Sequence, residues 1–337
     1  MSNDCPSLCS WFPFSDEPLV NGKLYAPKFC DPCILFPEQS CDGKWHMFLH
    51  SWIGIHHFIS TSGIAWEPDK VIAYRGHSPY IYTENEKYCL VYEIHDRKFP
   101  LKKGNRENQR YSRIEMITST DLRIWSKPRL LLDSRNVPYA GDYIKNPRVS
   151  RPQLVKADGI YRLYFGASHI VLPETGQKAS RYFSCAFSKE ITGPYVISDE
   201  MLGQSDPDDK WTNLGCGSMR IVEHDGRFYA FQCGIYWDDE QKKTHSAIIL
   251  KQSDDGLDFR QCENNPVLVP AQEGWASSYI MSCDVKYRKE EKCWYCYFSA
   301  NNGEKPLSKE SIGLLIGKEP AAVKNVTEPK VYGTFLK

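Results

Sequence analysis

The sequence predicts an all-β chain that folds as a five-bladed β-propeller. Three observations predict this fold: a strand-like run after a turn occurs five times, a second short element precedes each run, and a third follows four of them. Elements that recur in this order are typical of a propeller, whose blades contain about four strands each. A β-sandwich also has short, evenly spaced strands, but it does not predict ordered elements that repeat in register.

The central element of each repeat is a turn pair followed by aromatic and aliphatic residues. Residues 158–166 show the pattern, with Asp-Gly followed by Ile-Tyr-Arg-Leu-Tyr-Phe-Gly. Such a turn between apolar runs predicts a β-hairpin. The first aromatic residues of the five runs are Trp45, Tyr88, Tyr161, Phe228 and Trp294.

The preceding element predicts the innermost strand of each blade. Its first residue is Asp31, Ser78, Arg151, Ser218 or Asp284, ten residues before the aromatic in the last four repeats. Proline follows in the first three repeats, which suits the start of a strand rather than its middle. Because innermost strands line the channel of a propeller, we expect these five residues to converge at one end of it.

The third element is a serine six residues before an aromatic residue. It occurs at 60–66, 119–125 and 253–259, and with one inserted residue at 188–195. The fifth repeat lacks a clear copy and continues into 311–317. We therefore expect one propeller domain over 24–319, an N-terminal extension over 1–23 and a closing C-terminal segment over 320–337.

Composition excludes several functional classes. The chain has 42 basic and 42 acidic residues, so it lacks the basic footprint of a nucleic-acid-binding protein. No apolar run approaches the roughly 18 residues that would predict a membrane span. The N-terminus lacks the pattern of a secretory signal, which predicts a cytoplasmic protein. The sequence carries no signal of oligomeric state.

Thirteen cysteines, an odd number, predict reduced thiols rather than a disulfide framework. Two CxxC pairs are present, Cys30 with Cys33 and Cys293 with Cys296. The pairs are much farther apart than the roughly 15–20 residues of a zinc ribbon. We therefore predict no metal site, and nothing in the sequence indicates a cofactor.

Three carboxylates at predicted channel positions are the candidate catalytic residues: Asp31 in blade 1, Glu93 in blade 2 and Asp284 in blade 5. Blades 5, 1 and 2 are neighbours in a closed propeller. Glycoside hydrolysis needs one carboxyl that is protonated and one that is ionised, and burial and mutual repulsion can separate their pKa values in this way. Alternatively, Asp31 caps a turn, and Asp284 pairs with Arg151 or Lys286.

Further candidates for substrate binding lie at the ends of the predicted strands. They are His50, Trp52, His77, His95, Arg151 and Ser218. Trp52 offers a flat apolar face to a sugar ring, and the Arg151 guanidinium can orient a carboxylate or clamp one on a ligand. Residues 97–113 hold seven basic residues and one acid, so they form either a solvated loop or one that meets an anionic group.

The start Asp31-Pro-Cys-Ile, the turn Asp42-Gly-Lys-Trp and the box Ser119-Thr-Asp-Leu-Arg-Ile-Trp resemble the five-bladed propeller glycoside hydrolases. The resemblance is greatest to family 43, whose clan includes families 32, 62 and 68. It implies a small carbohydrate substrate, with Asp31 as general base. It also implies a second aspartate at the start of blade 3, a glutamate as general acid on blade 4, and inversion on arabinose- or xylose-containing glycans.

Two of these positions depart from the family pattern. Blade 3 has Arg151 where the second aspartate is expected, and residues 215–218 of blade 4 contain no carboxylate. The general acid is therefore Glu93 or Asp284, with His77 and His95 as weaker candidates, or hydrolysis by this route is lost. Three hypotheses follow: a glycoside hydrolase, a catalytically silent carbohydrate-binding propeller, and a phosphate-dependent glycosyl-transferring enzyme.

Overall fold

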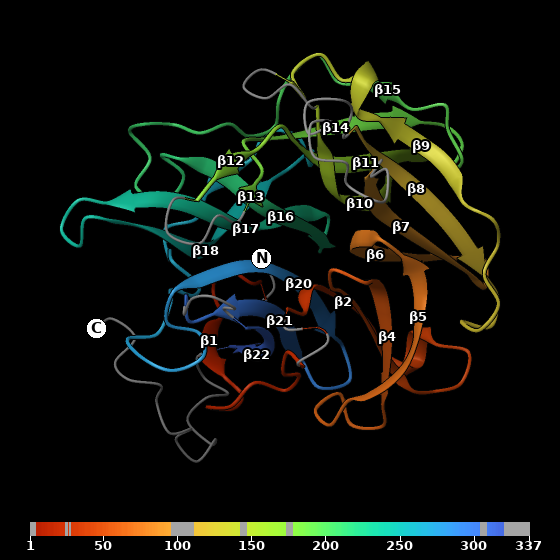
Figure 1. The fold of residues 1–337 in the computed structure, drawn as a ribbon, viewed down its shortest axis with the longest axis horizontal. Helices are drawn as coiled ribbons and strands as arrows, with labels where there is room; N and C mark the ends of the chain where they lie inside the picture. Colours follow the sequence, from red (N-terminus) through yellow and green to blue (C-terminus); the bar gives the residue numbers. More distant parts are fainter. Residues whose placement is uncertain are drawn as a thin grey trace, which may run out of the picture. The chain divides into compact units, whose positions relative to one another are not determined.

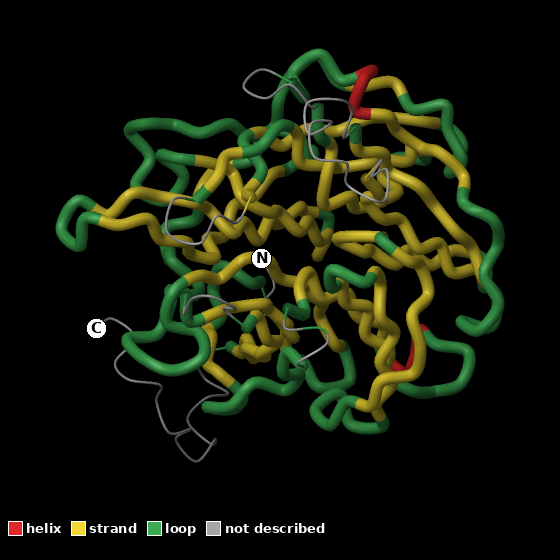
Figure 2. Tube along the Cα trace, viewed as in Figure 1, coloured by secondary structure: helices red, strands yellow, loops and turns green. Residues whose placement is uncertain are grey.

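The computed structural model describes residues 5–23, 26, 28–95, 111–141, 147–172, 178–303 and 309–319. Strands dominate these residues (Figure 2), and the helical elements among them are two 3-10 turns, η1 (Pro37–Gln39) and η2 (Ser134–Asn136). The chain divides into two compact units. Unit 1 comprises Met1–Pro32, Leu172–Gln177 and Ser205–Lys337, and unit 2 comprises Cys33–Val171 and Lys178–Gln204.

Unit 1 contains two four-stranded antiparallel sheets. The first, in the order β16-β17-β18-β19, consists of Gly215–His224, Arg227–Asp238, Lys243–Ser253 and Arg260–Gln261. The second, in the order β20-β21-β22-β1, consists of Tyr279–Arg288, Cys293–Asn301, Glu310–Lys318 and Ser10–Pro13. Its outermost strand therefore comes from the other end of the chain (Figure 1, red beside blue).

This pairing modifies the expected domain boundaries. Residues 10–13 of the expected N-terminal extension are part of a blade, with Ser10 opposite Lys318 and Pro13 opposite Leu315. Trp11 adds its side chain to the core of unit 1, where its ring meets Phe231 edge to face at 5.3 Å. The closing segment 320–337 lies outside the described residues.

Unit 2 contains three four-stranded sheets. The first is β2 (Cys30–Leu35), β3 (Trp45–His50), β4 (Gly54–Ser60) and β5 (Glu67–Tyr74), and the division between the units falls after Pro32 in β2. The second is β6 (Gly76–Glu84), β7 (Lys87–His95), β8 (Ser112–Ser119) and β9 (Arg129–Asp133). The third is β10 (Val149–Ala157), β11 (Ile160–Ala167), β14 (Tyr182–Ser188) and β15 (Val196–Ile197), and a small pair, β12 (Ile170–Val171) and β13 (Lys178–Ala179), extends this region.

The five sheets are the blades of a five-bladed β-propeller, so the fold class predicted from the sequence is confirmed. The first strands of the sheets, β2, β6, β10, β16 and β20, begin blades 1 to 5, and each pairs with a strand that begins at or next to a predicted hairpin aromatic. All five of those aromatic side chains are buried, being 7% exposed or less. The sequence repeat therefore reflects core packing, because one large side chain at a fixed distance from each turn fills the core of its blade.

The third sequence element ends the third strand of a blade. The Ser60 hydroxyl accepts hydrogen bonds from the N–H groups of Ser62 and Gly63, and the Ser253 hydroxyl accepts one from Gly256. The hydroxyl of Ser119 accepts the N–H of Asp121 in the same way. A serine at this position thus satisfies backbone donors that the sheet leaves unpaired as the chain turns away.

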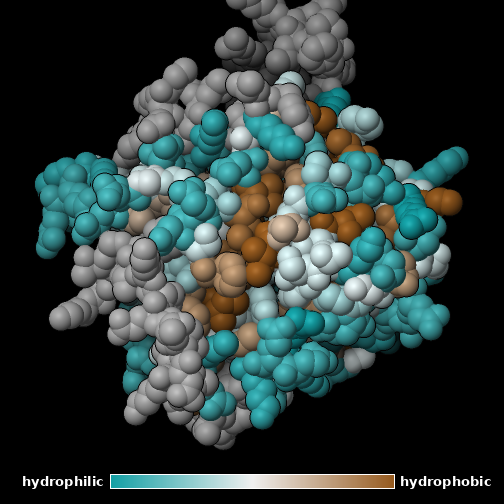
Figure 3. All heavy atoms as spheres, turned by 90° about the horizontal axis from the view of Figure 1, so that it is seen from below, coloured by the Kyte–Doolittle hydropathy of each residue, from teal (hydrophilic) through white to brown (hydrophobic). Residues whose placement is uncertain are grey.

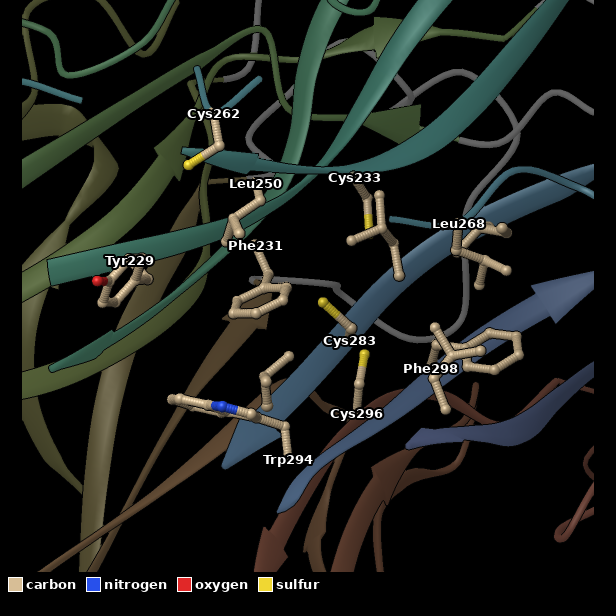
Figure 4. Packing of buried hydrophobic residues seen from close by; sticks show 14 of the residues in the cluster. Tyr229, Phe231, Cys233, Leu250, Cys262, Leu268, Cys283, Trp294, Cys296 and Phe298 are labelled. Atoms are coloured by element: carbon tan, nitrogen blue, oxygen red, sulfur yellow. The ribbon is translucent and has the colours of Figure 1, made fainter. Parts of the chain in front are cut away.

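The core of unit 1 is rich in cysteine (Figure 4). The side chains of Cys233, Cys283 and Cys296 lie together between Phe231 and Phe298, and all three cysteines are 3% exposed or less. All 13 cysteines of the chain are free thiols. Buried thiols of this kind act as small apolar side chains.

The face drawn in Figure 3 is mostly hydrophilic, with some exposed apolar side chains among the polar ones. Among the described residues, the structure has no helix that is both long enough and apolar enough to span a membrane.

Candidate active site

The innermost strands carry bulges close to the predicted site positions. The pairing shifts register between residues 77 and 80, 150 and 153, 215 and 218, and 280 and 282. Asp31, Ser78 and Arg151 have φ values of 50°, 48° and 49°, a left-handed conformation that is uncommon outside glycine. Bulges and positive φ redirect side chains and concentrate at functional sites. The sequence repeat therefore identified three specially shaped backbone positions.

In blades 4 and 5 the bulge lies earlier than the repeat indicates. The paired stretch beyond it covers residues 218–224 in blade 4, against 80–84 in blade 2, so it is two residues longer. The left-handed residue of blade 4 is Gly217, with φ 65°. Ser218 and Asp284 thus lie beyond their bulges, and they are not the structural equivalents of Ser78 and Arg151.

Asp31 belongs to a buried polar chain in unit 1. Its side chain and backbone are 3% exposed, and its N–H donates to the Ser282 hydroxyl at 3.1 Å. The Ser282 and Ser299 hydroxyls are 2.9 Å apart on paired strands, and Ser299 donates to Glu310 Oε1 at 2.9 Å. We call Cys30, Asp31, Ser282, Ser299 and Glu310 the carboxylate cluster.

The pKa of Glu310 is raised above its ordinary value. Burial raises its pKa, and the charge of Asp31 raises it further, against the lowering effects of the Cys30 thiol hydrogen bond and the Lys28 charge. Burial also raises the pKa of the Cys30 thiol well above its ordinary value, assisted by the charges of Glu310 and Asp31. A buried carboxyl whose pKa is raised beside a second carboxyl can act as a general acid.

Asp284 lies in the same unit, bound to an arginine. It is 2% exposed, and its Oδ1 is 3.3 Å from Nε of Arg220, which also donates to the carbonyl of Cys283. Residues 282 and 284 project from the same face of β20, so Asp284 and the carboxylate cluster share that face. Ser218 donates its hydroxyl to the carbonyl of Met281 at 3.1 Å.

Glu93 lies in unit 2, where it is completely buried and both carboxylate oxygens have hydrogen-bond partners. Arg148 donates from Nε to Oε1 at 2.7 Å and from Nη2 to Oε2 at 3.1 Å, and His95 Nε2 lies 2.8 Å from Oε1. Burial alone would raise the pKa of Glu93. The charges of Arg148 and His95 and their hydrogen bonds instead hold this pKa well below the ordinary value, which favours the ionised carboxylate.

His77 and His95 lie beside Glu93 in unit 2, and His50 lies beside His77. The ring of His77 meets those of His50 and His95 edge to face, with centroids 5.0 and 5.2 Å away. His50 Nδ1 accepts the N–H of Ser78 at 3.2 Å, which assigns its ring proton to Nε2 when the ring is neutral. Burial lowers the pKa of His77 to about 3, with the His50 charge acting in the same direction. His77 is therefore a neutral ring.

The remaining predicted residues of unit 2 are more accessible. Trp52 is 68% exposed, and Arg151 donates from Nη1 to the Ser180 hydroxyl at 3.4 Å. Among the described residues no group of three metal-ligating side chains could hold an ion. Residues 96–110, most of the basic loop, lie outside the described residues.

The structure thus gathers the predicted site residues in two places. Asp31, Ser218 and Asp284 belong to unit 1, and Glu93, Arg151, Trp52 and the three histidines belong to unit 2. Sequence reasoning missed four buried or half-buried charged or polar partners: Arg148, His169, Arg220 and Glu310. Arg148 could have been found three residues before Arg151, and Glu310 directly before the apolar run 311–317.

Comparisons with known proteins add evidence about the fold. No protein-family model matches the sequence, and no curated protein matches it. A thermostable family-43 glycoside hydrolase superposes with a TM-score of 0.59 at 13% identity, over 96% of this chain and 99% of that one. Zg3597, a family 117 glycoside hydrolase from Zobellia galactanivorans, gives 0.59 at 14% identity, over 98% and 96%.

A third similar structure carries out a different reaction. An N-acetylgalactosamine deacetylase from F. plautii, in complex with blood group B trisaccharide, superposes with a TM-score of 0.59 at 13% identity, over 92% of this chain and 95% of that one. At such identities the likeness establishes the fold, and one fold supports several reactions. The five-bladed propeller implied by the resemblance to family 43 is thereby confirmed.

Proposed function

We propose that this protein is a glycoside hydrolase that cleaves a small glycan or sugar conjugate by carboxylate acid–base catalysis. The observation that carries the proposal is the pair Asp31 and Glu310. Glu310 retains its proton to a higher pH than an ordinary glutamate, under the influence of burial and of the Asp31 charge. The raised pKa of Glu310 suits the general acid of glycoside hydrolysis, which needs one protonated carboxyl besides an ionised one.

In this proposal Asp31 is the general base and Glu310 the general acid. Asp31 activates water toward the anomeric carbon, while Glu310 protonates the departing oxygen. Glu93 and Asp284, the acids considered from sequence, are instead held by Arg148 and Arg220. His50, Trp52, His77, His95, Arg151 and Ser218 stay proposed substrate contacts.

The proposal is tested with a panel of aryl glycosides and short oligosaccharides. Asp31→Asn and Glu310→Gln should each lower kcat/KM by about 10²–10⁴-fold, the usual contribution of a general acid or base. The matched control is Asp225→Asn in the exposed hairpin turn of blade 4 of unit 1, which should retain full activity. Full activity in Asp31→Asn would refute the assignment of the base.

The ion pairs of Glu93 with Arg148 and of Asp284 with Arg220 favour a second candidate, a catalytically silent carbohydrate-binding propeller. This candidate predicts that the wild-type protein binds glycans in the same panel but turns over none of them. Asp31→Asn would then leave glycan affinity nearly unchanged.

Location and partners complete the proposal. The 13 free cysteines support a cytoplasmic enzyme, because disulfides persist mainly in oxidising compartments, with a small carbohydrate rather than an extracellular polymer as substrate. Immunofluorescence of the full chain, tagged at its C-terminus, tests the location: a diffuse cytoplasmic signal is expected, and export to the medium would refute it.

A further inference from the structure

Blade 3 concentrates positive charge at one end. Residues 148–151, 166–170 and 178–182 are neighbours there, because Ser150 pairs with Gly166, Ala167 with Tyr182, and Ile170 with Ala179. These three segments contain four cations and no acid: Arg148, Arg151, Lys178 and Arg181. We call these four residues the blade 3 basic cluster.

Within unit 2, Glu93 balances one of the four charges through its two hydrogen bonds to Arg148. Arg151 and Arg181 are half-buried and Lys178 is exposed, so an incoming ligand can reach them. Arg151 is held in place by its bond to the Ser180 hydroxyl, which is also 3.1 Å from the Ser150 hydroxyl. A guanidinium and two hydroxyls at one position match the oxygens of an oxyanion.

Two buried polar side chains at this end give independent support. Ser168 is completely buried and His169 is 6% exposed. The Ser168 hydroxyl and His169 Nδ1 have no hydrogen-bond partner among the residues that the structure describes. Buried polar groups normally have partners, so such a group indicates a missing ligand or water.

The pKa of His169 is lowered, as expected for a buried ring near cations. Burial lowers its pKa to about 3, and the charges of Lys178 and Arg148 lower it further, against the opposing charge of Glu93. His169 is therefore a neutral ring beside cations. A neutral imidazole and a hydroxyl can each hydrogen-bond an oxyanion while the cations supply the charge.

We propose that the blade 3 basic cluster binds an oxyanion, with Ser168 and His169 as neutral hydrogen-bonding partners. This inference deepens the proposed function, on which its biological meaning rests: the glycan substrate of the hydrolase is acidic. If phosphate takes the place of water in the reaction, phosphate is instead a co-substrate and glycosyl transfer replaces hydrolysis. A carboxylate, sulfate or phosphate on the sugar and free inorganic phosphate share the same chemistry, and the experiment separates these sources.

Binding is measured by calorimetry at constant ionic strength, with inorganic phosphate and with the matched pair glucuronate and glucose as probes. Phosphate and glucuronate should bind, and glucose should bind at least about 10-fold more weakly, as expected when a charge-assisted contact is lost. Arg151→Gln should weaken both anions by about 10-fold or more. Lys178→Gln, an exposed position that should not disturb folding, should weaken them several-fold.

The matched control is Lys189→Gln, which removes the same charge from an exposed position after β14, at the opposite end of the blade. It should leave both affinities unchanged. Equal affinities for glucuronate and glucose, or anion affinities unchanged in both Arg151→Gln and Lys178→Gln, would overturn the proposal.

Turnover then identifies the source of the anion. Faster cleavage of aryl glucuronides than of aryl glucosides supports an acidic sugar, and turnover that depends on added phosphate supports a phosphate co-substrate. Absence of all turnover, with anion binding that still responds to Arg151→Gln, refutes the proposed hydrolase and leaves the anion site standing. Turnover without any anion selectivity refutes the anion site and leaves the proposed hydrolase standing.

Discussion

Glu93 and Glu310 are both buried glutamates, but their neighbours favour opposite charge states. Glu93 has Arg148 and His95 within hydrogen-bonding distance, whereas Glu310 has a hydroxyl, a thiol and the Asp31 charge nearby. Burial acts on both side chains in the same direction. The difference therefore comes from the hydrogen-bonded cations: Arg148 and His95 bind Glu93 directly, whereas Lys28 acts on Glu310 through its charge alone.

Replacing Glu93 by glutamine should destabilise the protein strongly. Glu93→Gln leaves the half-buried guanidinium of Arg148 without its counter-charge, a change that costs about 3–5 kcal/mol. Urea unfolding measures the loss of free energy. The matched control, Glu84→Gln, breaks a more exposed pair with Lys156 and should cost about 1 kcal/mol or less. Equal losses in the two variants would contradict this account of Glu93.

The stability effect of Glu310→Gln should depend on pH. Because the folded-state pKa of Glu310 is raised, the folded protein binds more protons than the unfolded chain above about pH 4.5. Wild-type stability is therefore lost as pH rises through this window, and the neutral amide escapes that loss. Relative to wild type, Glu310→Gln should gain free energy of unfolding between pH 4 and pH 8. A constant difference across that range would show that the pKa is not raised.

At the scale of single strands, the bulges determine where side chains point. The bulges of blades 2 and 3 place Ser78 and Arg151 in the left-handed region, and in blade 4 Gly217 takes that conformation. A Cβ atom at Gly217 would lie 1.8 Å from the carbonyl oxygen of Cys233. The blade 4 bulge therefore leaves no room for a side chain at residue 217, whereas the bulges of blades 2 and 3 carry the side chains of Ser78 and Arg151.

Gly217→Ala should therefore lower the free energy of unfolding by more than about 2 kcal/mol, since both the positive φ and the clash must be relieved. Gly226→Ala is the matched control, because Gly226 also has a positive φ, 71°, but nothing lies within 4 Å of its Cβ position. It should cost about 1 kcal/mol. Thermal unfolding distinguishes the two, and equal melting temperatures would show that the bulge tolerates a side chain.

The repeat predicted the inner three strands of the blades well, because each contains a local signal: a bulge residue, a turn with a buried aromatic, or a serine turn. The outermost strands were not predicted. β15 and β19 are two residues long, and β1 comes from the other end of the chain. A strand that pairs at a distance of 300 residues in sequence leaves no local pattern.

For the candidate site, the sequence predicted individual residues better than their partners. Asp31 and Arg151 were identified because repeats mark the start of each inner strand. Arg148 and Glu93, in contrast, are 55 residues apart, and only the packed blades bring such groups together. The same limit applies to Glu310, whose effect on acid–base chemistry depends on a hydroxyl from β21 and on a thiol and a charge from β2.

At the scale of the whole molecule, the histidines with a lowered pKa are unevenly distributed between the two units. The histidines whose pKa is lowered are His56, His57, His77 and His169, with burial as the first cause in each. All four belong to unit 2. Lowering the pH should therefore destabilise unit 2 through protonation of these histidines. The described part of unit 1 offers no counterpart to them.

We expect unit 2 to open before unit 1 as pH falls from about 6.5. Because these histidines bind protons less well when folded, stability is complete above that pH and is lost toward the folded pKa values, at about 1.4 kcal/mol per pH unit for each buried ring. Hydrogen exchange followed by mass spectrometry at pH 7 and pH 5 measures the opening. His169→Gln should reduce the acid sensitivity of peptides 160–171. Uniform opening of both units would contradict the prediction.

The place of β1 beside β22 also bears on how the protein is made. Residues 10–13 are synthesised before the edge they pair with, residues 315–318, which lies more than 300 residues later in the chain. The sheet that contains both can therefore be completed only after residues 315–318 have left the ribosome.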